Sequence, residues 1–288
     1  MPTVSEPGTL EEAAEAISVG QTVSIGRDGG EVVVSTAKLN RILEHEPGDL
    51  TAIVEAGLRL SVLQHRLAGY GQMLALDPPG DPTIGACLAA DLSGPRRHRY
   101  GAMRDLVIGV TVVLADGTIA SSGGKVVKNV AGYDLGKLFS GSRGRLGLIA
   151  RVALRLHSRS AAEATVVAES SDPRALWQEL HRSQLEPSAV DILPAGRVAI
   201  LFEGAQAAVE AQVRAAPGEP ADAAVWEESA RLQGEAAARA PFAWQECLLA
   251  RPGPGIAYVV DAAERGAPAW SPLAERIRAS FDPEGILV

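Results

Sequence analysis

The chain has 288 residues, of which 47% are hydrophobic and 22% charged, and its formal net charge is -8. This length suits two domains, and this composition supports a full hydrophobic core rather than a disordered chain. The acidic balance argues against nucleic acid or an anionic membrane surface as the main partner.

Cysteine use and the N-terminal sequence indicate where the protein works. The two cysteines, Cys87 and Cys247, lie far apart without a C-x-x-C pair. The sequence therefore encodes neither a disulfide framework nor a cysteine-rich zinc or iron–sulfur site. The first residues are acidic and lack a signal-peptide pattern, and the longest apolar run, 106–115, is too short to span a bilayer. We expect a cytoplasmic protein without direct membrane insertion.

Short strands alternate with helices over the first 158 residues. Thr9 can cap a helix over 9–18, whose apolar residues repeat at helical spacing. Further along, the pattern predicts strands at 23–25, 31–35, 50–55 and 146–156, a helical turn at 39–43 and a helix at 61–70. A hairpin with an Asp-Gly turn joins 106–114 to 119–121. The alternation favours an α/β or α+β domain.

A different order of elements follows residue 158. The pattern predicts a strand at 164–169, a helix at 173–183, strands at 190–193 and 198–203, a helix at 205–215 and a strand at 223–227. This β-α-β-β-α-β order is the ferredoxin-like, split βαβ pattern. A helix at 229–239, strands around 244–250 and 256–260, and a last helix at 272–280 complete the chain.

Three stretches are candidates for binding. Glycines recur every third residue at 141, 144 and 147, a spacing that fits neither a G-x-G-x-x-G fingerprint nor a Walker A loop, so a surface loop is an equal alternative. Thr83 precedes a small-residue helix whose N-terminal N–H groups suit an anion, although an ordinary capped helix explains it too. The segment 95–99 carries three arginines and His98, which suits a phosphate, an acidic partner or a solvated surface.

Self-sufficient catalytic motifs are missing from the sequence. The five histidines form no H-E-x-x-H pair, and no G-x-S-x-G elbow is present. No catalytic residue can be named and no metal site is expected. Any chemistry must therefore come from a cofactor.

Several motifs in a fixed order carry a resemblance to a known family. They are Asp77-Pro78, Thr83-Ile84-Gly85, Ser93-Gly94, Tyr100-Gly101, Lys128-Asn129-x-x-Gly132-Tyr133-Asp134, Gly141-Ser142, Gly144-x-Leu146-Gly147-x-Ile149 and Phe281-Asp282-Pro283. Together they resemble the vanillyl-alcohol-oxidase/p-cresol-methylhydroxylase (PCMH) type of FAD-binding fold. Within it, the chain resembles the FAD-binding subunits of glycolate oxidases.

The resemblance implies a fold, a cofactor and partners. The implied fold is α+β: a PCMH-type FAD-binding domain of two α+β subdomains over 1–158, a ferredoxin-like cap over 159–270, and a C-terminal helix and tail over 271–288 that return to the first domain. The implied cofactor is non-covalent FAD. The implied partners are a catalytic FAD subunit and an iron–sulfur subunit, and the implied substrate is a small 2-hydroxy acid.

The resemblance also implies a set of cofactor-binding residues. In the first loop and in the second turn with the segment behind it, they are Gly26, Gly29, Pro78, Thr83, Ile84, Gly85, Ala86, Asp91, Ser93, Gly94 and Gly101. On the opposite wall they are Asn129, Tyr133, Asp134, Gly147 and Ile149.

The sequence departs from the family pattern in three places. The first glycine loop, 26–30, is short. Ala86 and Asp91 stand where the family usually has glycine and asparagine, and a carboxylate there is expected to repel a diphosphate. Arg143 and Arg145 replace the usual glutamate and threonine, which adds positive charge for the ADP part of FAD, for a partner, or for the surface alone. The short first loop keeps open a scaffold with weakened FAD binding as an alternative to the FAD-binding subunit. A stand-alone FAD-dependent D-2-hydroxy acid dehydrogenase is a further alternative, which the absence of a histidine cluster in the cap disfavours.

Overall fold

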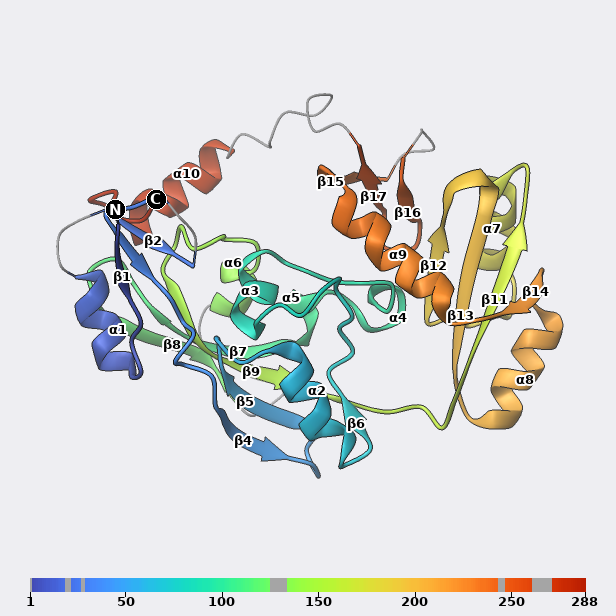
Figure 1. Cartoon of the computed structure of the whole chain (residues 1–288), viewed down its shortest axis with the longest axis horizontal. Helices are drawn as coiled ribbons and strands as arrows, with labels where there is room; N and C mark the ends of the chain where they lie inside the picture. Colours follow the sequence, from blue (N-terminus) through green and yellow to red (C-terminus); the bar gives the residue numbers. More distant parts are fainter. Residues whose placement is uncertain (1, 19–21, 27–28, 125–133, 243–246, 261–270) are drawn as a thin grey trace.

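The computed structural model describes residues 2–18, 22–26, 29–124, 134–242, 247–260 and 271–288. Figure 1 shows two α+β bodies side by side. The N-terminal body holds the chain up to residue 158 together with the C-terminal helix, and the cap holds the seven-stranded sheet of residues 162–259 with its helices.

A five-stranded antiparallel sheet forms the centre of the N-terminal body. Its strands, in spatial order, are β4 (Ile42–Glu46), β5 (Thr51–Glu55), β9 (Leu148–Arg155), β7 (Val107–Val113) and β8 (Ile119–Gly123). The helices that pack on it are α2 (Leu60–Ala68), α3 (Ile84–Ala89), α5 (Met103–Leu106) and α6 (Leu135–Phe139). Apolar residues of these helices, such as Leu63 and Phe139, share one core with Val110 and Val152 of the sheet. Burial of this core is the main stabilising contribution.

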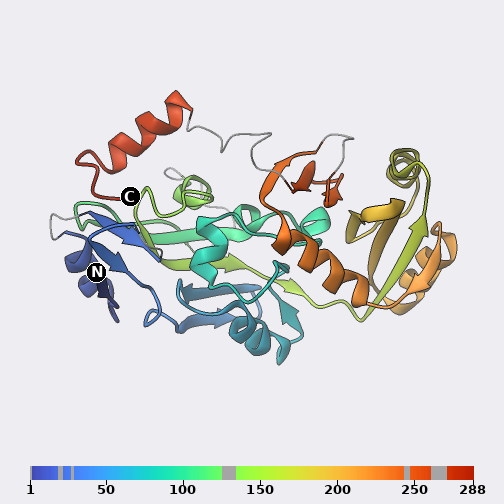
Figure 2. The same cartoon turned by 45° about the horizontal axis from the view of Figure 1, so that its top comes forward.

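A small parallel sheet in the same body brings the two ends of the chain together. It consists of β1 (Thr3–Ser5), β3 (Val32–Val34) and β2 (Val23–Ile25), and α1 (Leu10–Ile17) packs beside it. The last residues return to it after α10 (Pro272–Phe281): the N–H of Val23 donates to the carbonyl of Ile286 over 2.7 Å. Both views place α10 and the C-terminus on the N-terminal body, away from the cap sheet (Figures 1 and 2).

The cap has the ferredoxin-like arrangement that the sequence predicts. Its first six elements are β11 (Ala162–Glu169), α7 (Pro173–Arg182), β12 (Ala189–Ile192), β13 (Arg197–Gly204), α8 (Gln206–Ala215) and β14 (Glu219–Ala221). The four strands lie in the order β14-β11-β13-β12, so the first strand pairs with the third and fourth. The α+β class with a ferredoxin-like cap is thereby confirmed.

Three more strands extend the cap sheet beyond β12. They are β16 (Leu249–Arg251), β17 (Ile256–Val259) and β15 (Ala238–Pro241), preceded by helix α9 (Ala224–Glu235). Leu232 of α9 packs on Leu249 and Tyr258 of these strands. Helix α4 (Arg97–Tyr100) contacts β12 of the cap. In the N-terminal body, β6 (Gln72–Met73) forms a short ladder with β10 (His157–Ser158).

Some predicted elements are wrong. Residues 223–227 are not a strand: the strand is β14, where Pro220 is tolerated because the strand lies at the sheet edge. Trp226 instead lies in the first turn of a helix that begins at Ala224, and it donates its indole N–H to Thr165 over 2.9 Å. The helix predicted to reach 239 ends at Glu235, and the turn predicted at 39–43 runs into β4, since Ile42 pairs with Val54 of β5. Of the strand predicted around 244–250, residues 243–246 lie outside the described residues.

The arginine-rich segment predicted to meet a phosphate, a partner or solvent binds the cap instead. Arg96 lies 3.0 Å from Glu203, 3.2 Å from Glu163 and 3.6 Å from Asp77. Arg99 donates to the carbonyl of Glu203 over 2.9 Å. These contacts hold the two bodies against each other.

Within the described ranges, none of the helices is long and apolar enough to cross a membrane.

Candidate cofactor site

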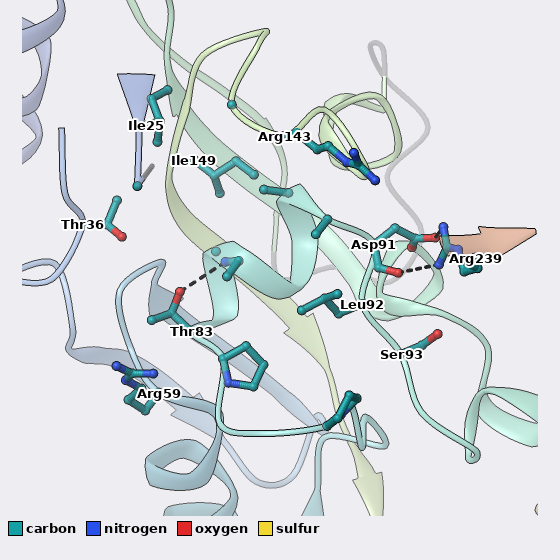
Figure 3. A pocket seen from close by; sticks show the side chains of 18 of the residues that line it. Ile25, Thr36, Arg59, Thr83, Asp91, Leu92, Ser93, Arg143, Ile149 and Arg239 are labelled. Atoms are coloured by element: carbon teal, nitrogen blue, oxygen red, sulfur yellow. Dashed lines mark hydrogen bonds and ion pairs between the residues drawn. The ribbon is translucent and has the colours of Figure 1, made fainter. Parts of the chain in front are cut away.

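A cavity of about 870 Å³ lies where the two bodies meet. The N-terminal body contributes Ile25–Gly26, Ser35–Ala37, Arg59, residues around α3, and Arg143, Gly144, Gly147 and Ile149. The cap contributes Gln233, Ala236–Arg239 and Tyr258. Figure 3 labels ten of the lining residues, among them Ile25 and Arg59 on one side of the opening and Arg239 on the other. Small-molecule sites usually occupy roughly 300–1,000 Å³ and often lie between domains, so this cavity is the candidate site.

The structure brings together half of the residues proposed for the cofactor. Those that line the cavity are Gly26, Thr83, Gly85, Ala86, Asp91, Ser93, Gly147 and Ile149. Gly29, Pro78, Ile84, Gly94, Gly101 and Asp134 lie outside the lining, and Asn129 and Tyr133 lie outside the described residues.

Three of the predicted residues outside the lining, Ile84, Gly94 and Asp134, have packing or capping roles. Ile84 is fully buried in the core. A Cβ on Gly94 would lie 1.9 Å from the carbonyl oxygen of Asp77, so no other residue fits there. Asp134 accepts the N–H of Lys137 over 3.1 Å and thus caps α6.

Sequence reasoning missed part of the lining. Thr36, Arg59, Arg239 and Tyr258 all face the cavity. Two of them belong to the cap, where no motif marks them, and only the folded chain brings them to the site.

The backbone at Gly26 is open toward the cavity. Gly26 has a φ of +64°, and a Cβ added there would meet nothing within 4 Å. A ligand can therefore approach this backbone closely. Gly147 differs, because its Cβ would lie 2.5 Å from the carbonyl oxygen of Val113, so protein packing alone requires that glycine.

The amide groups at the second turn are already used within the protein. Thr83 caps α3 by accepting the N–H of Ala86 over 3.2 Å. The N–H of Ile84 donates to Leu58 over 2.9 Å, and that of Gly85 donates to Ala56 over 2.7 Å. This turn is thus an ordinary capped helix start, the alternative that the sequence left open.

The charge of the cavity is opposite to that of the chain. Its charged lining residues within the described part of the chain are Arg59, Arg143, Arg239 and Asp91, whereas the whole chain has a formal net charge of -8. Such a concentration of guanidinium groups favours an anionic ligand.

Asp91 does not act as an uncompensated negative charge. Its carboxylate lies 3.3 Å from Arg239 and 3.7 Å from Arg97, and it accepts the hydroxyl of Ser140 over 3.2 Å. The repulsion of a diphosphate that the sequence predicts at this position is therefore offset by two neighbouring cations.

A buried network supports the cap side of the cavity. Arg251 is 1% exposed and pairs over 3.0 Å with Asp191, which is 0% exposed. Arg251 also donates to the hydroxyl of Tyr258 over 3.0 Å and to the amide oxygen of Gln233 over 2.7 Å. Gln233 in turn donates to the carbonyl of Ser93 over 2.8 Å, which links the network to the N-terminal body. Burial raises the pKa of Tyr258, so its hydroxyl stays protonated at neutral pH.

Residues 13–123 match the family model described as an FAD binding domain. This segment of the chain is thus similar to FAD-binding domains. Two solved structures of alkyldihydroxyacetonephosphate synthase share its fold: one has a TM-score of 0.70 at 15% identity over 98% of this chain and 75% of that chain. The other has a TM-score of 0.63 at 17% identity over 74% of this chain and 49% of that chain.

Curated relatives match between about half and two thirds of the chain. The glycolate oxidase subunit GlcE of Escherichia coli is 32% identical over 65% of this chain and 55% of its own length. The mitochondrial D-lactate dehydrogenase [cytochrome] 1 of Saccharomyces cerevisiae is 33% identical over 58% of this chain and 29% of its own length. The glycolate oxidase subunit GlcD of Bacillus subtilis is 37% identical over 48% of this chain and 30% of its own length. The chain thus spans between about a third and about half of these relatives.

The residues of the cavity fit FAD. The open backbone at Gly26 leaves room for a ligand, the arginines suit a diphosphate, and Ile25, Leu92 and Ile149 offer apolar contacts to aromatic rings.

Proposed function

We propose that this chain is the FAD-binding subunit of a complex that oxidises glycolate or a related 2-hydroxy acid. The observation that carries the proposal is the cationic cavity between the two bodies of an otherwise acidic chain, a segment of which is similar to FAD-binding domains. The relatives named for glycolate and D-lactate support the substrate class, because both compounds are 2-hydroxy acids.

The chain's own residues would hold the cofactor and exclude water from it. When bound, FAD supplies a two-electron acceptor for the hydride of the α-carbon of a 2-hydroxy acid. The arginines of the lining would provide positive charge near its phosphates, Ile25 and Ile149 would provide apolar surface, and Tyr258 and Gln233 would form the cap wall.

The ionisable groups of the cavity favour a subunit that passes electrons to partners over an enzyme that oxidises the substrate on its own. Within the described lining, these groups are the arginines, Asp91 and Tyr258. Arginine stays protonated, Asp91 is ion-paired, and burial raises the pKa of Tyr258, so none of them is a good base for the substrate hydroxyl. We therefore propose a catalytic FAD subunit and an iron–sulfur subunit as partners. A cytoplasmic location stays a prediction.

A scaffold subunit that binds little FAD is the second candidate. It is favoured by the amides of Ile84, Gly85 and Ala86, which donate to protein acceptors rather than to a ligand. In this case the fold would serve to dock the partner subunits.

The visible spectrum of the purified chain separates these functions. A yellow protein, or one that takes up added FAD stoichiometrically, supports the flavoprotein proposal. A chain that stays colourless after incubation with FAD supports the scaffold. Bleaching of the bound flavin by glycolate or D-lactate without any partner supports a stand-alone dehydrogenase and contradicts the subunit proposal.

A further inference from the structure

Arg143 lines the cavity and is held in place by its own backbone. Its N–H donates to the carbonyl of Ala89 at the end of α3 over 2.8 Å, and its φ is +53°. The next residue, Gly144, packs against Ile25, because a Cβ there would lie 3.2 Å from that side chain. The loop is thus fixed to both sides of the opening, and Figure 3 shows the Arg143 side chain projecting from it.

The other arginines of the lining already have partners, whereas Arg143 has none among the described residues. Arg239 pairs with Asp91, and Arg59 donates to the carbonyl of Asp81 over 2.6 Å. Within the described ranges, Arg143 makes no ion pair or side-chain hydrogen bond and its side chain is solvent-exposed. A guanidinium fixed at its base and free at its tip is ready to receive an anion.

Backbone groups around Arg143 offer little for such an anion. The N–H of Gly26 donates to Val34 over 2.9 Å, and that of Leu92 donates to Cys87 over 2.9 Å. The amides of the second turn are donated as well. An anion in this part of the cavity would therefore be bound by side chains.

We propose that Arg143 binds the diphosphate of the cofactor, in the role that glycine-rich backbone amides would otherwise have. The planar guanidinium can donate two parallel hydrogen bonds to phosphate oxygens. The proposal rests on the proposed function, because the diphosphate is that of FAD. Arg143 stands where the family pattern usually has glutamate, so this contact belongs to the present chain.

Three ligands separate charge recognition from a general effect on the fold. FAD carries both the flavin and the diphosphate, riboflavin carries the flavin without phosphate, and ADP carries the diphosphate without flavin. Their dissociation constants would be measured, by flavin fluorescence and by calorimetry, for the wild-type chain, Arg143→Ala and Arg143→Glu. Arg214→Ala is the matched control, since it removes the same charge from the exposed last turn of α8.

The expected result is a loss of affinity for phosphate-bearing ligands alone. Losing a hydrogen bond to a charged group corresponds to about a tenfold loss or more, so Arg143→Ala should weaken FAD and ADP by that factor. Arg143→Glu should weaken them further, while riboflavin and the Arg214→Ala control stay within about twofold of the wild type.

Two results would overturn the proposal. One is an Arg143→Glu variant that binds FAD as tightly as the wild type, and the other is a riboflavin affinity that falls by the same factor as the FAD affinity. If the wild-type chain binds neither FAD nor ADP, this result would instead contradict the proposed function itself.

Discussion

The guanidinium of Arg239 holds Asp91 twice: it donates to the backbone carbonyl over 2.9 Å and lies 3.3 Å from the carboxylate. Asp91 follows α3 in the N-terminal body, and Arg239 belongs to β15 in the cap. Both residues line the cavity, so the same pair joins the two bodies and forms part of the cofactor site.

This pair predicts a measurable coupling between Asp91 and Arg239. In a double-mutant cycle of Asp91→Asn and Arg239→Gln, we expect an interaction energy of about 0.5–1 kcal/mol, because such pairs are partly screened by solvent. The Arg239 side chain is 40% exposed, which keeps the value modest. Urea unfolding measures it, with the surface pair Arg231–Glu235 as control. We also expect Asp91→Asn alone not to tighten FAD binding, and additive single-variant effects would contradict the coupling.

The buried pair of Arg251 and Asp191 predicts a larger effect. Replacing Arg251 by Met should destabilise the protein by about 3–5 kcal/mol, because the Asp191 carboxylate is left buried without a counter-charge. Adding Asp191→Leu should recover most of this loss, since an apolar pair of similar size avoids the desolvation cost.

Unfolding by urea would measure both changes in the free energy of unfolding. Arg197→Met, in the more exposed pair with Glu228, is the control and should cost far less. Equal losses in Arg251→Met and Arg197→Met would show that burial does not decide the outcome.

Asp77 predicts a pH dependence of stability. Burial raises its pKa from 3.8 to about 6, although the neighbouring Arg96 opposes the shift. The folded state then binds the proton more tightly than the unfolded state, so the contribution of Asp77 to stability falls as pH rises between about 4 and 6. The total change is at most about 3 kcal/mol.

The test for Asp77 compares the free energy of unfolding of the wild type with that of Asp77→Asn across this pH range. We expect the difference between them to change below pH 6 and to level off above it. Asp81→Asn is the control, because hydrogen bonds from Ser61 lower the pKa of Asp81 and its contribution is lost as pH falls. Parallel curves for the wild type and Asp77→Asn would rule out the raised pKa.

Gly147 predicts a steric limit at the cavity wall. Gly147→Ala should destabilise the protein by about 1–3 kcal/mol, because the added methyl group would collide with the carbonyl of Val113 and cannot be relieved by side-chain movement. Gly48→Ala is the matched control, since a Cβ there meets nothing within 4 Å. Thermal unfolding that shifts equally in both variants would contradict this explanation.

Local sequence patterns predicted most of the fold correctly. The helix capped by Thr9, the Asp-Gly hairpin and the β-α-β-β-α-β order depend on neighbouring residues, and all three are present. The elements that failed depend on distant partners. Ile42 is in a strand because Val54 pairs with it, and Glu219–Ala221 is a strand because Thr165–Val167 offers an edge.

The site was harder to predict than the fold for the same reason. Thr83 and Gly147 lie in motifs, so the sequence pointed to them. Arg239 reaches Asp91 across 148 positions, and Arg96 reaches Glu203 across 107, distances at which no spacing rule applies. The amides of the second turn were predicted to bind the cofactor, but those of Ile84 and Gly85 donate to Leu58 and Ala56 instead. A sequence does not show such hydrogen bonds.

The strand Val23–Ile25 obtains one of its neighbours from the end of the chain. Leu287 forms a bridge with Val23, and the buried carboxylate of Asp282 fixes the N–H groups of Ile286 and Leu287 over 2.8 and 2.9 Å. The cap lies between these two segments in the sequence. During synthesis on a ribosome, the cap therefore emerges before Leu287, the residue that pairs with the β2 edge of the three-stranded sheet. The contacts of Val23 with Ile286 and Leu287 can therefore form only after the whole cap has been made.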